Sequence, residues 1–149
     1  MKTKSLAFLF LLILLTFAIQ TKAANLTIGD PRQSRYTYPG SIEDMQITVK
    51  PHGAYFEIGM FLRISPVGSI YKSEKDTLEA VLNFESSKYS FINESWLFID
   101  ESVYIRAKLL DRYTAGVIYE GIVKRRKYPS IVYNNGQDTY QVRSFPLIG

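Results

Sequence analysis

The chain has 149 residues, no cysteine and a formal net charge of +4 at pH 7. This length fits a single ordinary domain, and the missing cysteines exclude disulfides, thiol nucleophiles and thiolate metal sites. Three of the 18 Lys and Arg residues lie within the first 23 residues, so the other 15 nearly balance the 14 acidic residues. The charge balance therefore gives no support for a nucleic-acid partner.

The segment 1–23 has the organisation of a secretory signal peptide. Lys2 and Lys4 form its basic start, Leu6 to Ile19 is an apolar run, and cleavage is expected after Ala23. The run is shorter than the roughly 20 residues that span a bilayer. We therefore expect a secreted, extracellular protein without a transmembrane anchor, whose residues 24–149 form one domain.

Residues 24–42 are rich in Gly, Pro, Ser, Arg and Tyr, which predicts an N-terminal arm with one short strand at most. Beyond this arm, apolar and polar residues alternate over 45–49 and again over 56–64, the pattern of half-buried strands. Pro51-His52-Gly53 interrupts the pattern with turn residues. Together these segments predict an antiparallel hairpin.

The segment 73–84 is compatible with two structures. Ser73 and Asp76 resemble a helix capping box, whereas the apolar residues that follow have both helical spacing and the alternation of a strand. We expect a short helix or turn near 74–80, leading into a strand near Val81.

Five further strands are expected in the C-terminal half, at 96–99, 103–109, 117–123, 131–133 and 139–145. The first of them is apolar on both faces, which is typical of a central strand. Turn residues occupy 111–116, and Asn135-Gly136 suits a hairpin turn with a loop somewhat longer than two residues.

About seven or eight strands with turns at short intervals predict an all-β fold. We expect an antiparallel β-sandwich, with a small β-barrel as the alternative. Aromatic residues make up 14% of the chain. Large rings cover cross-strand neighbours on a sheet, so we expect them to contribute much of the stability that disulfides provide elsewhere.

The residues that could carry catalysis are few. His52 is the one histidine and lies at the expected hairpin turn, where a solvated side chain is the ordinary outcome. The carboxylate pairs Glu43-Asp44 and Asp100-Glu101 are adjacent in sequence, so their side chains point to opposite faces of a strand. We expect no catalytic site, no metal site and no cofactor.

The most distinctive local feature is a run of four positive charges, Lys124, Arg125, Arg126 and Lys127, which we call the basic cluster. It is expected at a strand end or in the connection to the next strand, where a solvated loop is the ordinary interpretation. A contact with a sulfated glycan or lipid head groups is the functional alternative. Cleavage by a protease that recognises paired basic residues ranks third.

Two sequons, at Asn25 and Asn93, indicate exposed positions that a secretory pathway could glycosylate. Tyrosines spread over most strands could also form a recognition surface. We therefore expect a non-enzymatic binding or effector protein outside the cell, whose partner is a protein, a glycan or a membrane surface. The alternative is a barrel that carries a small apolar ligand.

Overall fold

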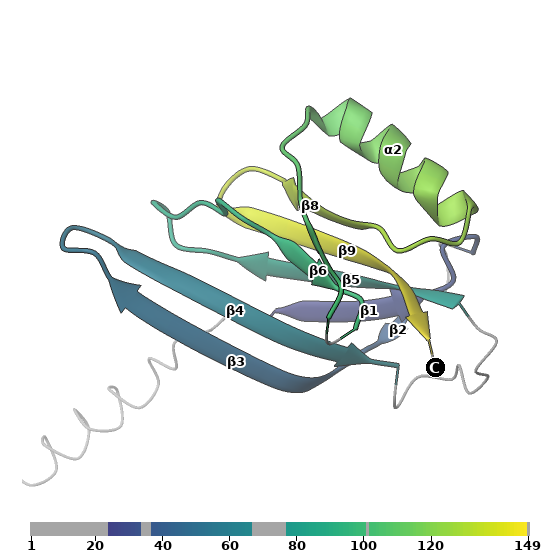
Figure 1. Ribbon diagram of the computed structural model, residues 1–149, viewed down its shortest axis with the longest axis horizontal. Coiled ribbons are helices and arrows are strands. Elements are labelled where there is room, and N and C mark those ends of the chain that lie inside the picture. The colour runs from purple at the N-terminus through teal and green to yellow at the C-terminus, as the bar shows by residue number, and fades with distance from the viewer. Residues whose placement is uncertain (1–23, 34–36, 67–76, 101, 149) are drawn as a thin grey trace, which may run out of the picture.

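A computed structural model describes residues 24–33, 37–66, 77–100 and 102–148. The expected signal peptide lies outside this range. The described residues form antiparallel strands and a single helix, so the predicted all-β class is confirmed. The strands build separate layers in a sandwich-like arrangement and do not close into a barrel, which removes the alternative fold (Figure 1).

Five strands form the main sheet, in the spatial order β2, β1, β5, β9, β8. Their bounds are Asn25–Gly29 for β1, Thr37–Pro39 for β2, Thr77–Glu85 for β5, Ser130–Asn134 for β8 and Thr139–Ile148 for β9. All neighbouring strands are antiparallel. β5 occupies the centre of the sheet, between β1 and β9, and this position explains why its own residues are mostly apolar.

The core lies on one face of this sheet. Leu26, Ala80 and Leu82 form its centre, and Leu62 and Ile64 of a separate hairpin pack against them. Side chains on a strand point alternately to opposite faces, so the neighbouring Glu79 faces the other side of the sheet.

The separate hairpin consists of β3, Ser41–Pro51, and β4, Phe56–Ser65, as the alternating pattern predicted. Its turn contains Gly53 at a positive φ of 69°. Just before β3 the chain passes so close to the core that a Cβ atom on Gly40 would lie 2.8 Å from the Ile28 side chain. Glycine is therefore required at this corner.

The last hairpin, β8–β9, is also confirmed. Its loop holds Gly136, Gln137 and Asp138, all with positive φ. The loop is longer than two residues, as expected from the spacing of the strands.

Two expectations for the N-terminal and central segments are wrong. Residues 24–42 contain two strands, and β1 lies inside the main sheet rather than in an arm. Residues 77–80 belong to β5 and not to a helix; residues 74–76 lie outside the described range. Burial of alternate side chains between β1 and β9 outweighs the weak helical spacing of this segment.

The segment expected as a central strand at 96–99 is β6, Trp96–Phe98. It pairs only with β7, Tyr104–Arg106, which is shorter than the strand predicted over 103–109. Trp96 and Phe98 remain exposed, although the centroids of the Phe98 and Phe61 rings, in β6 and β4, are 5.6 Å apart. β6 is therefore not a central strand: each of its two apolar faces is only partly covered.

The largest correction concerns 117–123, predicted as a strand. These residues belong to α2, Arg112–Lys124. The helix covers the face of the main sheet opposite the core, while the β3–β4 hairpin lies on the core side (Figure 1).

Candidate functional site

The helix begins where Asp111 caps its N-terminus. The Asp111 side chain accepts a hydrogen bond of 2.9 Å from the Thr114 backbone N–H. Hydrogen bonds from Thr114 also lower the pKa of this carboxyl. Ala115, Tyr119 and Ile122 follow at helical spacing and turn toward the sheet. The cap together with this spacing is the signal that the sequence interpretation missed.

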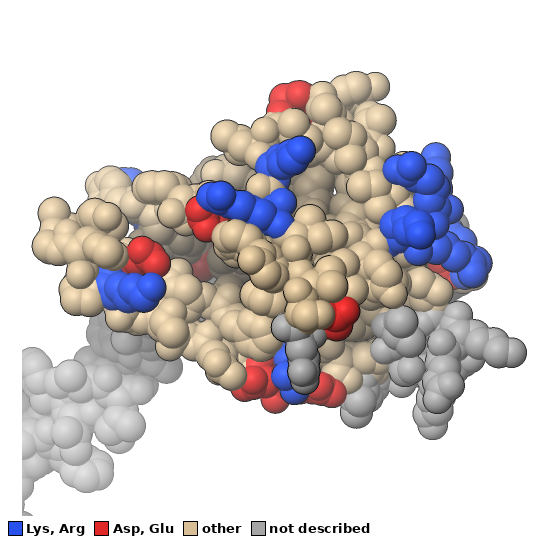
Figure 2. Space-filling view, in the orientation of Figure 1, with Lys and Arg blue, Asp and Glu red and all other residues tan. Residues whose placement is uncertain are grey.

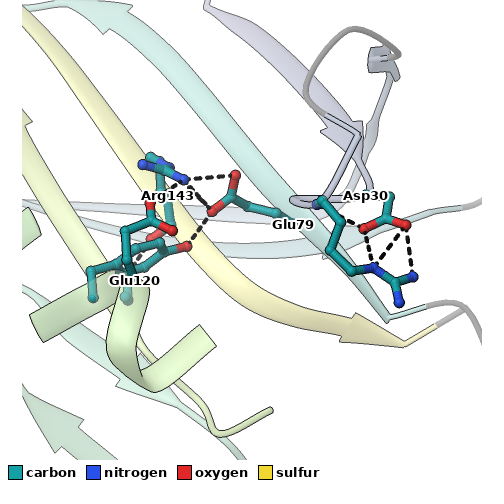
Figure 3. Close-up of polar contacts among 7 residues, drawn as sticks. Asp30, Glu79, Glu120 and Arg143 are labelled. Atoms are coloured by element: carbon teal, nitrogen blue, oxygen red, sulfur yellow. Dashed lines mark hydrogen bonds and ion pairs between the residues drawn. The ribbon is translucent and has the colours of Figure 1, made fainter. Parts of the chain in front are cut away.

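A polar network anchors the helix to the sheet (Figure 3). The Tyr119 hydroxyl, on a side chain only 2% exposed, donates to Glu79 Oε1 at 2.5 Å. Arg143 of β9 donates from Nε and Nη2 to the two carboxylate oxygens of Glu79, at 3.1 and 3.2 Å. Its Nη2 also lies 3.2 Å from Glu120 Oε1 on the helix. Burial, followed by the hydrogen bond to Glu79, raises the pKa of Tyr119. The phenol therefore stays protonated as a structural donor.

The basic cluster lies at the C-terminal end of α2 and in the turn that follows. Lys124 is the last helical residue, and Arg126 has a positive φ of 52°. The Arg126 backbone N–H donates to Val123 O at 2.9 Å, and that of Lys127 donates to Ile122 O at 3.3 Å. These bonds satisfy carbonyls at the helix end. The expected connection to the next strand is thus correct, but a helix precedes it.

All four side chains of the basic cluster are exposed, and positive side chains gather at this end of the molecule (Figure 2). Within the described residues, no carboxylate forms an ion pair with any of the four. Arg125 Nε donates to Gly121 O at 3.1 Å, which helps to close the last turn of the helix. Positive charge here also complements the helix dipole.

Two other basic residues, Arg112 and Arg106, lie away from the basic cluster. Arg112 begins the helix, about 18 Å along the axis from Lys124 at 1.5 Å per residue. Arg106 pairs with Glu94 and lies over the Trp96 ring. Neither Arg112 nor Arg106 therefore extends the basic cluster.

A groove of about 940 Å³ runs between the helix and the β8–β9 hairpin. The helix lines it with residues that include Tyr113, Gly116, Val117, Gly121 and Lys124. Tyr133, Gln141 and Arg143 line it from the strands. Gly121 is unusual because a helix-interior glycine costs about 1 kcal/mol relative to alanine. A Cβ atom there would meet nothing within 4 Å, so packing does not require glycine at this position.

The remaining candidates behave as ordinary surface residues. His52 stacks on Tyr55, with ring centroids 5.0 Å apart, and its Nε2 lies 3.3 Å from Glu57. Asp100 Oδ1 accepts backbone hydrogen bonds from Ser102 and Val103, which close a turn. Among the described residues, no group of three or more His, Cys, Asp and Glu side chains could hold a metal ion. No described helix is long and apolar enough to cross a membrane.

Both sequon asparagines, Asn25 and Asn93, are exposed. Of the tyrosines considered for recognition, Tyr119 and Tyr140 are buried, and Tyr36 lies outside the described residues. Tyr55, Tyr104 and Tyr128 are exposed.

The β3–β4 hairpin has an apolar face, and the main sheet covers this face only near the base of the hairpin. Toward the turn, five side chains on this face are about half exposed or more: Met45, Ile47, Val49, Ile58 and Met60. Contiguous exposed apolar surface of this kind is uncommon on a monomeric domain.

Comparisons with known proteins find no similarity to this chain. No protein-family model, no curated protein and no solved structure matches it. Functional inference therefore depends on the residues themselves.

Proposed function

We propose that this chain is a secreted, non-enzymatic binding protein that contacts an anionic extracellular surface through the basic cluster. Support for secretion comes from the basic start, apolar run and small terminal residue of the segment 1–23. The exposed sequons at Asn25 and Asn93 are compatible with that route, and we include their glycosylation in the proposal.

The observation that carries the binding proposal is four adjacent, exposed cations without an ion-pair partner among the described residues. Outside the basic cluster, the expected mature chain has 11 basic and 14 acidic residues, so positive charge is concentrated at this end of the molecule and gives it a local positive potential. Such a potential attracts sulfate and phosphate groups that are arrayed on a surface.

Arg126 adds a second line of support. A non-glycine residue in the left-handed region costs roughly 1–2 kcal/mol, and glycine commonly occupies the position after a helix. Arg126 instead places a cation there at φ 52°. The helix dipole favours positive charge in this region. The left-handed backbone of Arg126 adds support for a role of its charge in binding, because glycine would adopt this conformation at lower cost.

The test neutralises the cluster in the variant Lys124→Gln, Arg125→Gln, Arg126→Gly, Lys127→Gln. Glycine at 126 suits the observed φ, so the fold is retained. Binding is measured at low salt to immobilised heparin and to vesicles containing phosphatidylserine; the two arms distinguish glycan from lipid. The wild type is expected to bind at least one of them and to lose binding as salt is raised.

The control variant removes the same charge elsewhere, with Lys50→Gln, Arg63→Gln, Lys88→Gln and Lys108→Gln. These side chains are also exposed. The proposal requires that the cluster variant loses binding while the control retains it. Equal binding by both variants, or no binding by the wild type to either surface, would refute the proposal.

The alternative of a barrel carrier has lost its structural basis, because the sheets do not close around an interior. The sandwich-like layers are filled by side chains such as Leu26, Leu82 and Ile64.

A further inference from the structure

The groove between α2 and the β8–β9 hairpin combines apolar surface with the charged side chains of Arg112, Glu120, Lys124 and Arg143. Val117, Tyr113 and the Tyr133 ring supply carbon surface along it, and Lys124 stands at one end. The groove is largely open to solvent, and its volume of about 940 Å³ is large enough to take a small molecule along the helix. The groove is distinct from the exposed surface of Arg125, Arg126 and Lys127.

Two of the helix positions along this groove carry no side chain. Gly116 and Gly121 both line it, and a Cβ atom on Gly116 would lie 3.3 Å from the Tyr133 hydroxyl. A Cβ atom on Gly121 would meet no protein atom within 4 Å. Gly121 therefore leaves space that the protein itself does not fill.

Most of the charged groups of the groove are already engaged. Arg112 donates to Asn134 O and Asn135 Oδ1 and lies over the Tyr133 ring. Arg143 is held by Glu79 and Glu120. Lys124 forms no ion pair with a described residue, so it is the group that can neutralise an anionic ligand.

This distribution favours a hydrocarbon over a peptide. An extended peptide would bring amide groups that need hydrogen-bond partners, whereas the helix backbone and the arginines are already satisfied. An alkyl chain needs only apolar contact, and a single anionic head group can meet Lys124.

We propose that this groove binds a medium-chain anionic amphiphile, with its alkyl chain along Val117 and Gly121 and its carboxylate at Lys124. This site goes beyond surface binding by the basic cluster, because it holds one small ligand in a defined orientation. It also differs from a barrel carrier, because the ligand lies between helix and sheet.

The probe is dodecanoate, titrated calorimetrically into the purified protein below its micelle concentration. Saturable one-to-one binding is expected, with weaker binding of the neutral dodecanol and of dodecyltrimethylammonium. Lys124→Gln should weaken dodecanoate about fivefold, as loss of a partly exposed ion pair implies, and leave dodecanol unchanged. The absence of saturable dodecanoate binding would overturn the proposal.

Gly121→Leu tests the position of the alkyl chain. Leucine favours a helix more than glycine does, so the thermal unfolding midpoint should not fall. Its side chain would occupy the groove and weaken dodecanoate about tenfold or more. Thr114→Leu, on an exposed helix position that does not line the groove, is the matched control and should bind normally. Unweakened binding by Gly121→Leu would locate the amphiphile elsewhere and refute the proposal.

A third variant separates the two proposals. Arg125→Gln, Arg126→Gly, Lys127→Gln leaves Lys124 and the groove intact, so it should bind dodecanoate as the wild type does while losing affinity for anionic surfaces. If this variant loses dodecanoate binding, the groove proposal is wrong even where surface binding is confirmed.

Discussion

At the scale of single residues, the polar side chains that join α2 to the main sheet, Glu79, Tyr119 and Arg143, determine how the helix is held. Glu79 lies next to the core residues Leu78 and Ala80 along β5, yet it is buried on the opposite face. A carboxylate in that place needs charged and hydrogen-bonding partners, and Arg143 and Tyr119 supply them. The sequence shows Glu79 only as an ordinary strand residue, because its partners lie 40 and 64 positions away.

Replacing Tyr119 with phenylalanine should lower the free energy of unfolding by about 1.5–3 kcal/mol, because a buried hydrogen bond to a charged group is lost. The measurement is urea unfolding followed by far-ultraviolet circular dichroism. Tyr113→Phe makes the same chemical change on a side chain that is 81% exposed, and its effect should stay below about 0.5 kcal/mol. Equal stabilities for the two variants would show that the Tyr119–Glu79 hydrogen bond contributes nothing.

Asp30 gives the chain a pH dependence. Its carboxylate accepts hydrogen bonds from the Arg32 side chain and backbone, which lower the pKa of Asp30 (Figure 3). A native pKa below the unfolded value of about 3.9 stabilises the fold above that pH. This contribution is lost as the pH falls through the native pKa.

Below about pH 4, the free energy of unfolding should therefore fall less steeply with decreasing pH for Asp30→Asn than for the wild type. Arg32→Gln, which removes the charged guanidinium that donates to Asp30, should reduce the slope in the same direction. Urea unfolding at a series of pH values measures both. A variant Asp30→Asn with the wild-type slope would rule out this linkage.

At the scale of elements, the β3–β4 hairpin combines two environments on one face. Ile64, near its base, packs against the core, whereas Ile58, near its turn, is 66% exposed. The alternation in sequence is the same at both positions. The two positions differ because the main sheet lies beneath the base of the hairpin, next to Ile64, and not beneath its turn end, near Ile58.

Ile64→Ala should cost about 1–2 kcal/mol, since it removes apolar contacts from a partly buried site. Ile58→Ala, the same change in the same strand, should cost less than about 0.5 kcal/mol. Thermal and urea unfolding of both variants make the comparison. A loss at Ile58 as large as that at Ile64 would mean that another surface covers the outer part of the hairpin.

At the scale of the whole molecule, the main sheet unites segments from both ends of the described chain. β9 lies between β5 and β8, and its Arg143 holds Glu79. The last hairpin is therefore a necessary part of the sheet, although the basic cluster precedes it.

Cleavage within the cluster by a protease specific for paired basic residues should leave the hairpin bound. β9 retains its pairing with β5 from Thr77 to Glu85, so both fragments should elute together and separate only in denaturant. Gel filtration followed by mass spectrometry detects this. A chain ending at Lys127 should, in contrast, fail to unfold cooperatively, because the core loses Val142 and Leu147. Release of the fragment without denaturant would contradict the expectation.

The amino-acid sequence by itself determined the all-β class, the β3–β4 and β8–β9 hairpins, and the absence of cysteine chemistry. These features depend on local alternation, on turn residues such as Asn135-Gly136, and on composition. The sequence also located the basic cluster, but not the helix that presents it.

Only the tertiary structure decided that α2 packs on the face of the main sheet opposite the core, that β1 belongs to that sheet and that part of a strongly apolar hairpin face stays exposed. A local pattern defines which side chains share a face, but it does not define which distant segment covers that face. The groove depends on the same long-range packing, because Gly116 and Tyr133 approach each other only once α2 lies on the sheet.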